Sequence, residues 1–321
     1  MRLLDRELIT LNNICNMKRT LITMLAVLLL GTVAFAQPLK VQEKDFDKFT
    51  RVSVEDNFVL RFYEANSYSV KLKTDARIAD HVQAYVKNGT LYLILNEKDY
   101  SSELKKELRQ KGAAAPVLEA EVYMPSFNSL VIKDKSVLMH CDKFYTETFT
   151  ITASDHSLVS QLNLECSTVE FNVSKNAQLT ANVTVASKLY LNSANSTQVS
   201  LTQNGGNTFI SHAGSSYVDF KANVNSLEVE GTSGSESHIS GNATLLTTTG
   251  SGSTRIDAEL LDVPEGNALL SGSAKCHVNV SDKLKVNLTG GSMLTFKRSP
   301  VFEIDRIVNS TLIKADDEKR K

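Results

Sequence analysis

The chain has 321 residues, 42% of them hydrophobic, and a formal net charge of −1. A protein that binds nucleic acid needs a basic surface, so this balance excludes nucleic acid from the expected partners. Charge is sparse in the second half of the chain, where Ser, Thr and Asn alternate with apolar residues.

Residues 1–36 have the pattern of an export signal. The positive pair Lys18-Arg19 precedes the apolar stretch 21–33, and the small-x-small motif Ala34–Ala36 follows it. Met17 opens this pattern and is an alternative start site. About 13 apolar residues are too few to span a bilayer. We therefore expect a cleaved signal peptide and a mature protein without a transmembrane segment, located in the periplasm or at the cell surface.

Residues 37–125 alternate apolar and polar residues in the manner of strands, but they do not repeat. Asp75 to His81 is expected to contain a short helix, and Lys87–Thr90 has the signal of a hairpin turn. Residues 101–115 form a charged insertion, which predicts a surface loop with a helical turn. An open end of a repeat stack exposes unpaired strand edges, so we expect this region to form a cap.

Residues 126–303 repeat with a period of about 20 residues. Each unit has a short β-type run, a polar kink centred on a small residue, and a second apolar residue. Asn, Asp and Gly precede many of the kinks, and these residues tolerate left-handed backbone. The kink centres are Ser136, Ser157, Ala177, Thr197, Ser216, Ser237, Thr254, Ala274 and Ser292.

This repeat predicts a solenoid, in which each unit buries its apolar residues by stacking on its neighbours. Within one unit, Val169, Phe171 and Val173 alternate with polar residues, which indicates a strand. Gaps of irregular length favour the right-handed type. We predict an all-β fold, a right-handed parallel β-helix with a strand-rich N-terminal cap; a β-sandwich is the alternative. Residues 304–321 are expected to add a C-terminal strand and a frayed tail.

The apolar residue just past each kink is predicted to lie in a core column that runs along the stack. Each member should contact the coil above and the coil below. The predicted column is Leu138, Val159, Leu179, Val199, Val218, Ile239, Ile256, Val278 and Leu294.

On a solenoid, catalytic or ligand-binding residues should be visible in the sequence as departures from the repeat. We identify no catalytic, cofactor-binding or metal site on this basis. Asp134 and Asp155 occupy near-equivalent positions, as the clustered carboxylates of β-helix polysaccharide lyases and hydrolases do. The next coils carry Asn176 and Asn195 there, so we interpret all four as turn formers. The run 250–257 is interpreted as a Gly/Ser turn and not as a calcium-binding repeat.

Histidines, cysteines and outward aromatic residues are spread over different registers. Measured from the kink centres, the offsets of five histidines are +4, −1, −4, +1 and +3, so no shared metal site is expected. Three cysteines are interpreted as buried small apolar residues rather than disulfides, whereas Cys15 falls in the signal. Tyr190 and Tyr217 are expected to point outward without forming a shared sugar-binding platform. The five histidines are His140, His156, His212, His238 and His277, and the three cysteines are Cys141, Cys166 and Cys276.

Taken in order, these elements resemble a family of secreted Bacteroidetes proteins, the putative auto-transporter adhesin, head GIN domain family. The resemblance covers roughly Phe46 to Phe302 and implies a β-helical fold with an adhesive or envelope role. The insertion at 101–115 and the low Gly content of residues 149–199 depart from the family pattern. The matching pieces are the signal peptide, Phe49–Val54, Tyr68–Val70, Asn88–Leu91, Met124–Leu130 and Gly250–Ser253.

The leading hypothesis is a non-enzymatic exported cell-envelope protein, an adhesin or surface-recognition β-helix whose partners are surface glycans or envelope proteins. No cofactor is expected, and the ligand-binding residues and oligomeric state stay open. The alternatives are a carbohydrate-active β-helix enzyme and a purely structural periplasmic protein. A cleft with three or more acidic or basic residues at one register on neighbouring coils would favour the enzyme.

Overall fold

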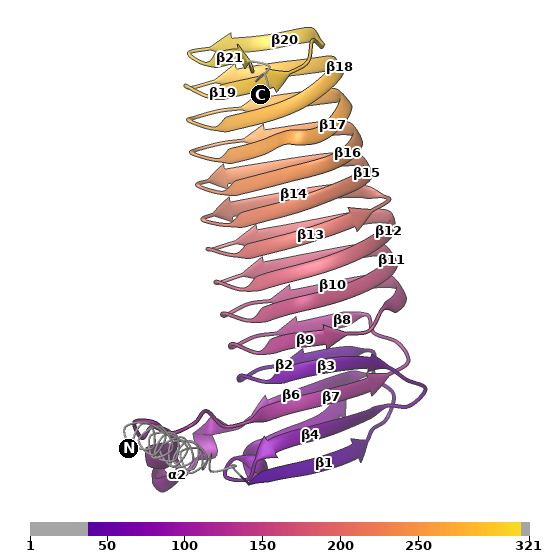
Figure 1. The fold of residues 1–321 in the computed structure, drawn as a ribbon, viewed down its shortest axis with the longest axis vertical. Coiled ribbons are helices and arrows are strands. Elements are labelled where there is room, and N and C mark those ends of the chain that lie inside the picture. The colour runs from indigo at the N-terminus through magenta and orange to yellow at the C-terminus, as the bar shows by residue number, and fades with distance from the viewer. Residues whose placement is uncertain (1–37, 316–321) are drawn as a thin grey trace, which may run out of the picture. The chain divides into compact units, whose positions relative to one another are not determined.

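The structure is a computed structural model that describes residues 38–315. The expected signal peptide and the end of the tail, residues 316–321, lie outside the described residues. The structure is 69% strand with one helix and forms a parallel β-solenoid of about 10 turns, with coils about 19 residues long (Figure 1). This confirms the predicted parallel β-helix. Within residues 38–315, no helix is long and apolar enough to cross a membrane.

The elements follow one another along the chain with few long connections. The helical elements are η1 (Ala79–His81), η2 (Glu97–Asp99) and α2 (Ser102–Leu108). The strands are β1 (Leu39–Asp45), β2 (Arg51–Val54), β3 (Val59–Glu64), β4 (Ser69–Asp75), β5 (Val82–Lys87), β6 (Thr90–Leu95), β7 (Leu118–Met124), β8 (Ser129–Ile132), β9 (Val137–Cys141), β10 (Phe144–Ala153), β11 (Leu158–Ser174), β12 (Gln178–Ala194), β13 (Gln198–Asn204), β14 (Asn207–Gly214), β15 (Tyr217–Ser233), β16 (Glu236–Gly250), β17 (Arg255–Leu270), β18 (Lys275–Thr289), β19 (Met293–Lys297), β20 (Val301–Val308) and β21 (Thr311–Lys314).

Each coil has two faces joined by a tight turn, which we call the pre-turn face and the post-turn face. On the pre-turn face, β14 pairs in parallel with the second halves of β12 and β15. On the post-turn face, β13 pairs in parallel with the first halves of β12 and β15. Long strands such as β12 therefore contribute to both faces. Successive coils stack along the length of the molecule (Figure 1).

In the first turns of the stack, two consecutive residues lie in the left-handed backbone region. Asp134 and Lys135 have φ of 51° and 63°, and Asp155 and His156 have φ of 56° and 65°. The amide of each second residue donates to the carbonyl of the next coil, as in Lys135 N to Asp155 O at 3.0 Å. Asn and Asp tolerate this conformation because their side chains bond locally. The interpretation of Asp134 and Asp155 as turn formers fits this geometry.

Alternation along the strands builds the core. Val169, Phe171 and Val173 are buried, and the polar residues between them are exposed or half-buried, as predicted. The predicted column is confirmed in its first part, where Leu138, Val159, Leu179, Val199 and Val218 stack in register.

Two members of the predicted column are wrong. Val218 stacks on Ser237, and the column continues through Ile256, Cys276 and Leu294. Ile239 and Val278 are buried, but each lies two residues further along its strand. The slip at Ile239 arises because the small buried residue that stacks on Ser216 is Ser235 and not Ser237. Several small residues between 232 and 237 satisfy the pattern, so sequence spacing alone does not select among them.

Parallel pairing extends beyond residues 126–303 at both ends. At the N-terminal end, β2 and β3 already form a coil that pairs with β8 and β9. Strands β6 and β7 pair in parallel with β2 and β3 beneath this coil. Antiparallel pairing of β1 with β4, β4 with β7 and β5 with β6 then covers that end, which is the role expected of a cap. The hairpin turns at Asn88-Gly89, as predicted, and α2 forms in the charged insertion.

Strands β20 and β21 continue the stack at the C-terminal end, where they pair with β18 and β19. Val301 and Ile304 on β20 are 72% and 55% exposed, which sets this last coil apart from the apolar residues buried inside the stack.

Candidate functional site

Four titratable side chains occupy one outward position on four consecutive coils of the post-turn face. Asp219, His238, Asp257 and His277 come from β15, β16, β17 and β18, and each is in register with the next. Stacked coils lie about 4.8 Å apart, so neighbouring side chains are within reach of one another. We call these four residues the acid–histidine ladder.

This ladder is hidden in the sequence by the register slip at Ser237. Counted from Ser235, His238 has an offset of +3, and His277 has the same offset from Ala274. The expected scatter of the histidines is therefore wrong for these two. Asp219 and Asp257 also lie three residues after the buried small residue of their own coils. A comparison of the residues at this one offset would therefore have identified the ladder from the sequence.

The remaining histidines lie elsewhere on the coil, as expected. His140 pairs with Asp142 at 3.0 Å, and His156 lies in a left-handed turn. His212 points into the core, where it is 1% exposed, and among residues 38–315 neither ring nitrogen has a hydrogen-bond partner. Burial lowers the pKa of His212 to about 4.

His238, one of the four ladder residues, lies near two carboxylates. Its Nε2 lies 3.1 Å from Glu236 Oε1, and its Nδ1 lies 3.8 Å from Asp257 Oδ2. The ring also packs against Tyr217, with centroids 5.5 Å apart. An imidazole in this position is one of the side chains that can serve as a metal ligand.

The repeat is broken beside the ladder. β17 shifts register against β16 between His238 and Ser240, and against β18 between Ala258 and Val263. Extra residues on one strand form a bulge, and bulges often re-aim side chains at functional sites. A cavity of about 260 Å³ lies at this point, lined by Asp219, His238, Ile239, Ser240, Asp257, Glu259 and Leu260.

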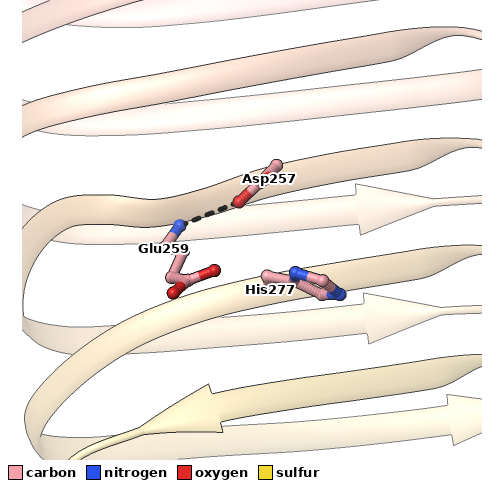
Figure 2. Close-up of side chains that lie close together, drawn as sticks. All are labelled: Asp257, Glu259 and His277. Atoms are coloured by element: carbon pink, nitrogen blue, oxygen red, sulfur yellow. Dashed lines mark hydrogen bonds between the residues drawn. The ribbon is translucent and has the colours of Figure 1, made fainter. Parts of the chain in front are cut away.

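The bulge sets Glu259 beside two members of the ladder. Figure 2 shows Asp257 and Glu259 on β17 and His277 on the adjacent coil. The Glu259 amide donates to Asp257 Oδ1 at 3.2 Å. One ligand atom from each of these half-buried residues lies within 4.8 Å of the other two, a spacing that suits a metal ion.

The acidic turn residues have an ordinary structural role. Asp155 accepts a hydrogen bond from Ser154 Oγ at 2.7 Å, and Lys175 Nζ lies 3.3 Å from its carboxylate. The Ser154 hydrogen bond, together with Lys175, lowers the pKa of Asp155. Asp134 occupies the same turn on the preceding coil.

The outward aromatic residues are divided between the two faces. Tyr217 lies beside the ladder on the post-turn face, and Tyr190 lies on the pre-turn face, so they form no shared platform, as expected. Tyr190 stacks instead on Phe209 of the next coil, with centroids 5.2 Å apart and planes inclined by 14°. This pair was not predicted from the sequence; its two residues occupy the same register on neighbouring coils, 19 positions apart.

The cysteines are buried and free, as interpreted from their registers. Cys141, Cys166 and Cys276 are at most 5% exposed. Burial raises the pKa of these thiols to about 12, 11 and 12 respectively, so they remain protonated at neutral pH.

The chain is similar to known proteins in sequence and in fold. The solved structures it resembles include a putative adhesin from Parabacteroides merdae, at 14% identity over 88% of this chain and 98% of that chain, with a TM-score of 0.44. A putative lipid binding protein from Parabacteroides distasonis matches at 13% identity over 88% and 98%, with a TM-score of 0.43. A putative adhesin from the same species matches at 14% identity over 87% and 98%, with a TM-score of 0.40.

A search among curated proteins found no match. The family model described as "Putative auto-transporter adhesin, head GIN domain" matches this chain twice, over residues 48–185 and 170–300. The two matches together take in most of the coils and the strands before them. The chain therefore belongs to the putative auto-transporter adhesin, head GIN domain family.

Proposed function

We propose that this protein is a non-enzymatic adhesin of the cell envelope that recognises a surface glycan through the outer faces of its β-helix. The observation that carries the proposal is membership of the adhesin family over most of the chain. The export signal expected in residues 1–36 is consistent with a periplasmic or surface location.

The outer surface of the coils offers a fixed array of neutral polar groups. Asn192 Nδ2 donates to Asn172 Oδ1 at 2.9 Å on the pre-turn face, and Asn182 Nδ2 donates to Asn163 Oδ1 at 3.4 Å on the post-turn face. Each amide has both donors and an acceptor, so unused groups remain for sugar hydroxyls. These groups lie on rigid strands, which lowers the entropic cost of binding.

The Tyr190–Phe209 pair gives this surface an aromatic platform. Both rings are half-buried and nearly parallel, with Asn192 two residues from Tyr190 on the same outward side. Sugars combine an apolar C–H face with hydroxyl edges, and an aromatic pair flanked by amides matches both. We therefore place glycan recognition on the pre-turn face around this pair.

The proposal is tested by glycan-array and whole-cell binding with the double variant Tyr190→Ala, Phe209→Ala. The expected result is loss of binding in the double variant. Tyr145→Ala, which removes a tyrosine that is 61% exposed elsewhere on the stack, should bind as the wild type does. Blank arrays and no cell binding by the wild type would contradict the proposal and favour a purely structural periplasmic protein.

A second candidate, a carbohydrate-active enzyme, has one observation in its favour. The acid–histidine ladder places four acidic or basic residues at one register beside a cavity. Carboxylates and imidazoles in this arrangement are suited to general acid–base chemistry. Turnover of a uronic-acid polymer that is lost in Asp257→Asn and retained in Asp155→Asn would establish the enzyme and overturn the adhesin proposal.

A further inference from the structure

The bulge in β17 brings a third metal-ligating group, Glu259, to Asp257 and His277, which already stack in register on adjacent coils. In a regular strand, residues two apart share an outward face but lie roughly 7 Å apart along the chain. Here the register shift after Ala258 lets one ligand atom each of Asp257, Glu259 and His277 fall within 4.8 Å of the others (Figure 2). The repeat thus places Asp257 beside His277, and the departure from the repeat adds Glu259.

The donor set selects among metal ions. Two carboxylates and one imidazole suit Zn²⁺ and related first-row ions, which combine nitrogen and oxygen ligands. Ca²⁺ takes six to eight oxygen ligands, and Mg²⁺ retains most of its water, so neither gains from the imidazole of His277.

The hydrogen bonds around the cluster leave suitable lone pairs available. Asp257 Oδ1 accepts from the Glu259 amide, which holds the carboxylate in place while Oδ2 remains for a ligand. His238 Nδ1, 3.8 Å from Asp257 Oδ2, is a positioning group on the neighbouring coil. Lys297 from β19 forms an ion pair with Glu259 Oε1, so its ammonium competes with a metal ion for that carboxylate.

We propose that Asp257, Glu259 and His277 bind one Zn²⁺ ion on the post-turn face. Three protein ligands leave a further coordination position that faces solvent, because all three side chains are half-buried at the surface. The site lies on the opposite face from the aromatic pair, so it is independent of the proposed glycan recognition.

The first experiment is a Zn²⁺ titration of chelator-treated protein, with a chromophoric chelator as competitor and Ca²⁺ as the comparison ion. The expected result is one tight Zn²⁺ site per chain that excess Ca²⁺ does not displace. His277→Ala and Asp257→Asn should each weaken Zn²⁺ binding by at least about tenfold. His156→Ala, which removes an exposed histidine in a turn, should leave the affinity unchanged.

Lys297→Met gives a second measurement that does not depend on removing a ligand. Loss of the competing ammonium should tighten Zn²⁺ binding by roughly three- to tenfold. Zn²⁺ affinity unchanged in His277→Ala, Asp257→Asn and Lys297→Met, with circular dichroism showing folded variants, would overturn the proposal. Displacement of Zn²⁺ by equal Ca²⁺ would also overturn it, because it would indicate a carboxylate site without the imidazole.

Discussion

The coils from β12 to β15 and the coils from β16 to β18 share one architecture but differ in regularity. β13 pairs with both of its neighbours without a register shift, and its outward residues are uncharged. β17 shifts register against both neighbours, and its outward positions carry Asp257 and Glu259. The comparison indicates that the regular coils provide the scaffold, whereas the bulged coils concentrate titratable groups.

The strongest test of the regular half is a charge placed in its core column. Val199 is fully buried between Leu179 and Val218, so Val199→Asp would bury an unpaired carboxylate between coils. We expect a loss of stability of about 3–5 kcal/mol in denaturant unfolding. The adjacent Gln198 is exposed, and Gln198→Asp should change stability by no more than about 0.5 kcal/mol. Equal losses would show that the register is wrong.

The bulged half is tested at Gly241, where β16 passes close to the coil before it. Gly241 has φ of +107°, and an added Cβ would lie 1.9 Å from the carbonyl oxygen of Ala222. Gly241→Ala must therefore shift the backbone, and we expect a loss of about 3 kcal/mol in the free energy of unfolding. Gly234→Ala, with its nearest neighbour at 3.8 Å, is the control and should cost less than about 1 kcal/mol. A similar loss in both variants would contradict this account.

His212 makes the regular half sensitive to acid. Burial lowers its pKa from 6.5 to about 4, so the unfolded chain binds the proton more readily than the fold does. The stability is complete above pH 6.5 and falls as the pH drops towards 4, by about 3 kcal/mol in total. His212→Leu should flatten this dependence in denaturant unfolding at pH 7 and pH 4.5, and His156→Leu should not. A pH profile identical in wild type and His212→Leu would rule out this role.

The smallest expected effect is a gain in stability from a substitution at the junction of the two halves. Ser237 interrupts the apolar column between Val218 and Ile256, and its buried hydroxyl has no hydrogen-bond partner within residues 38–315. Ser237→Ala removes that unpaired group and should raise stability by about 1 kcal/mol. Ser235 Oγ has a partner in Thr254 Oγ1 at 3.3 Å, so Ser235→Ala should give no gain. Thermal denaturation distinguishes the two, and a loss in Ser237→Ala would contradict the prediction.

The sequence predicted the fold well because the same physical pattern recurs in every coil. Alternation identified the buried residues, and Asn, Asp and Gly identified the left-handed turns before the kinks. The register of a coil could be predicted from the sequence only where a single small residue identified the position of its turn. Where Ser and Gly cluster between 232 and 237, that mark is ambiguous, and the slip hid the alignment of His238 with His277.

The site was harder to predict than the fold because it depends on an irregularity. Glu259 reaches Asp257 and His277 only through the extra residues in β17, and no local sequence signal distinguishes these residues from an ordinary strand. The Tyr190–Phe209 pair was predictable in principle, since both residues occupy one register of unbroken coils.

The stacking of neighbouring coils also determines how this molecule would respond to mechanical load. Each ladder of hydrogen bonds joins segments only about 19 residues apart in the chain. Tension applied through the chain ends would open these ladders one coil at a time, and each step would release roughly 60 Å of extended chain. The length of the molecule under load would therefore grow in steps of one coil.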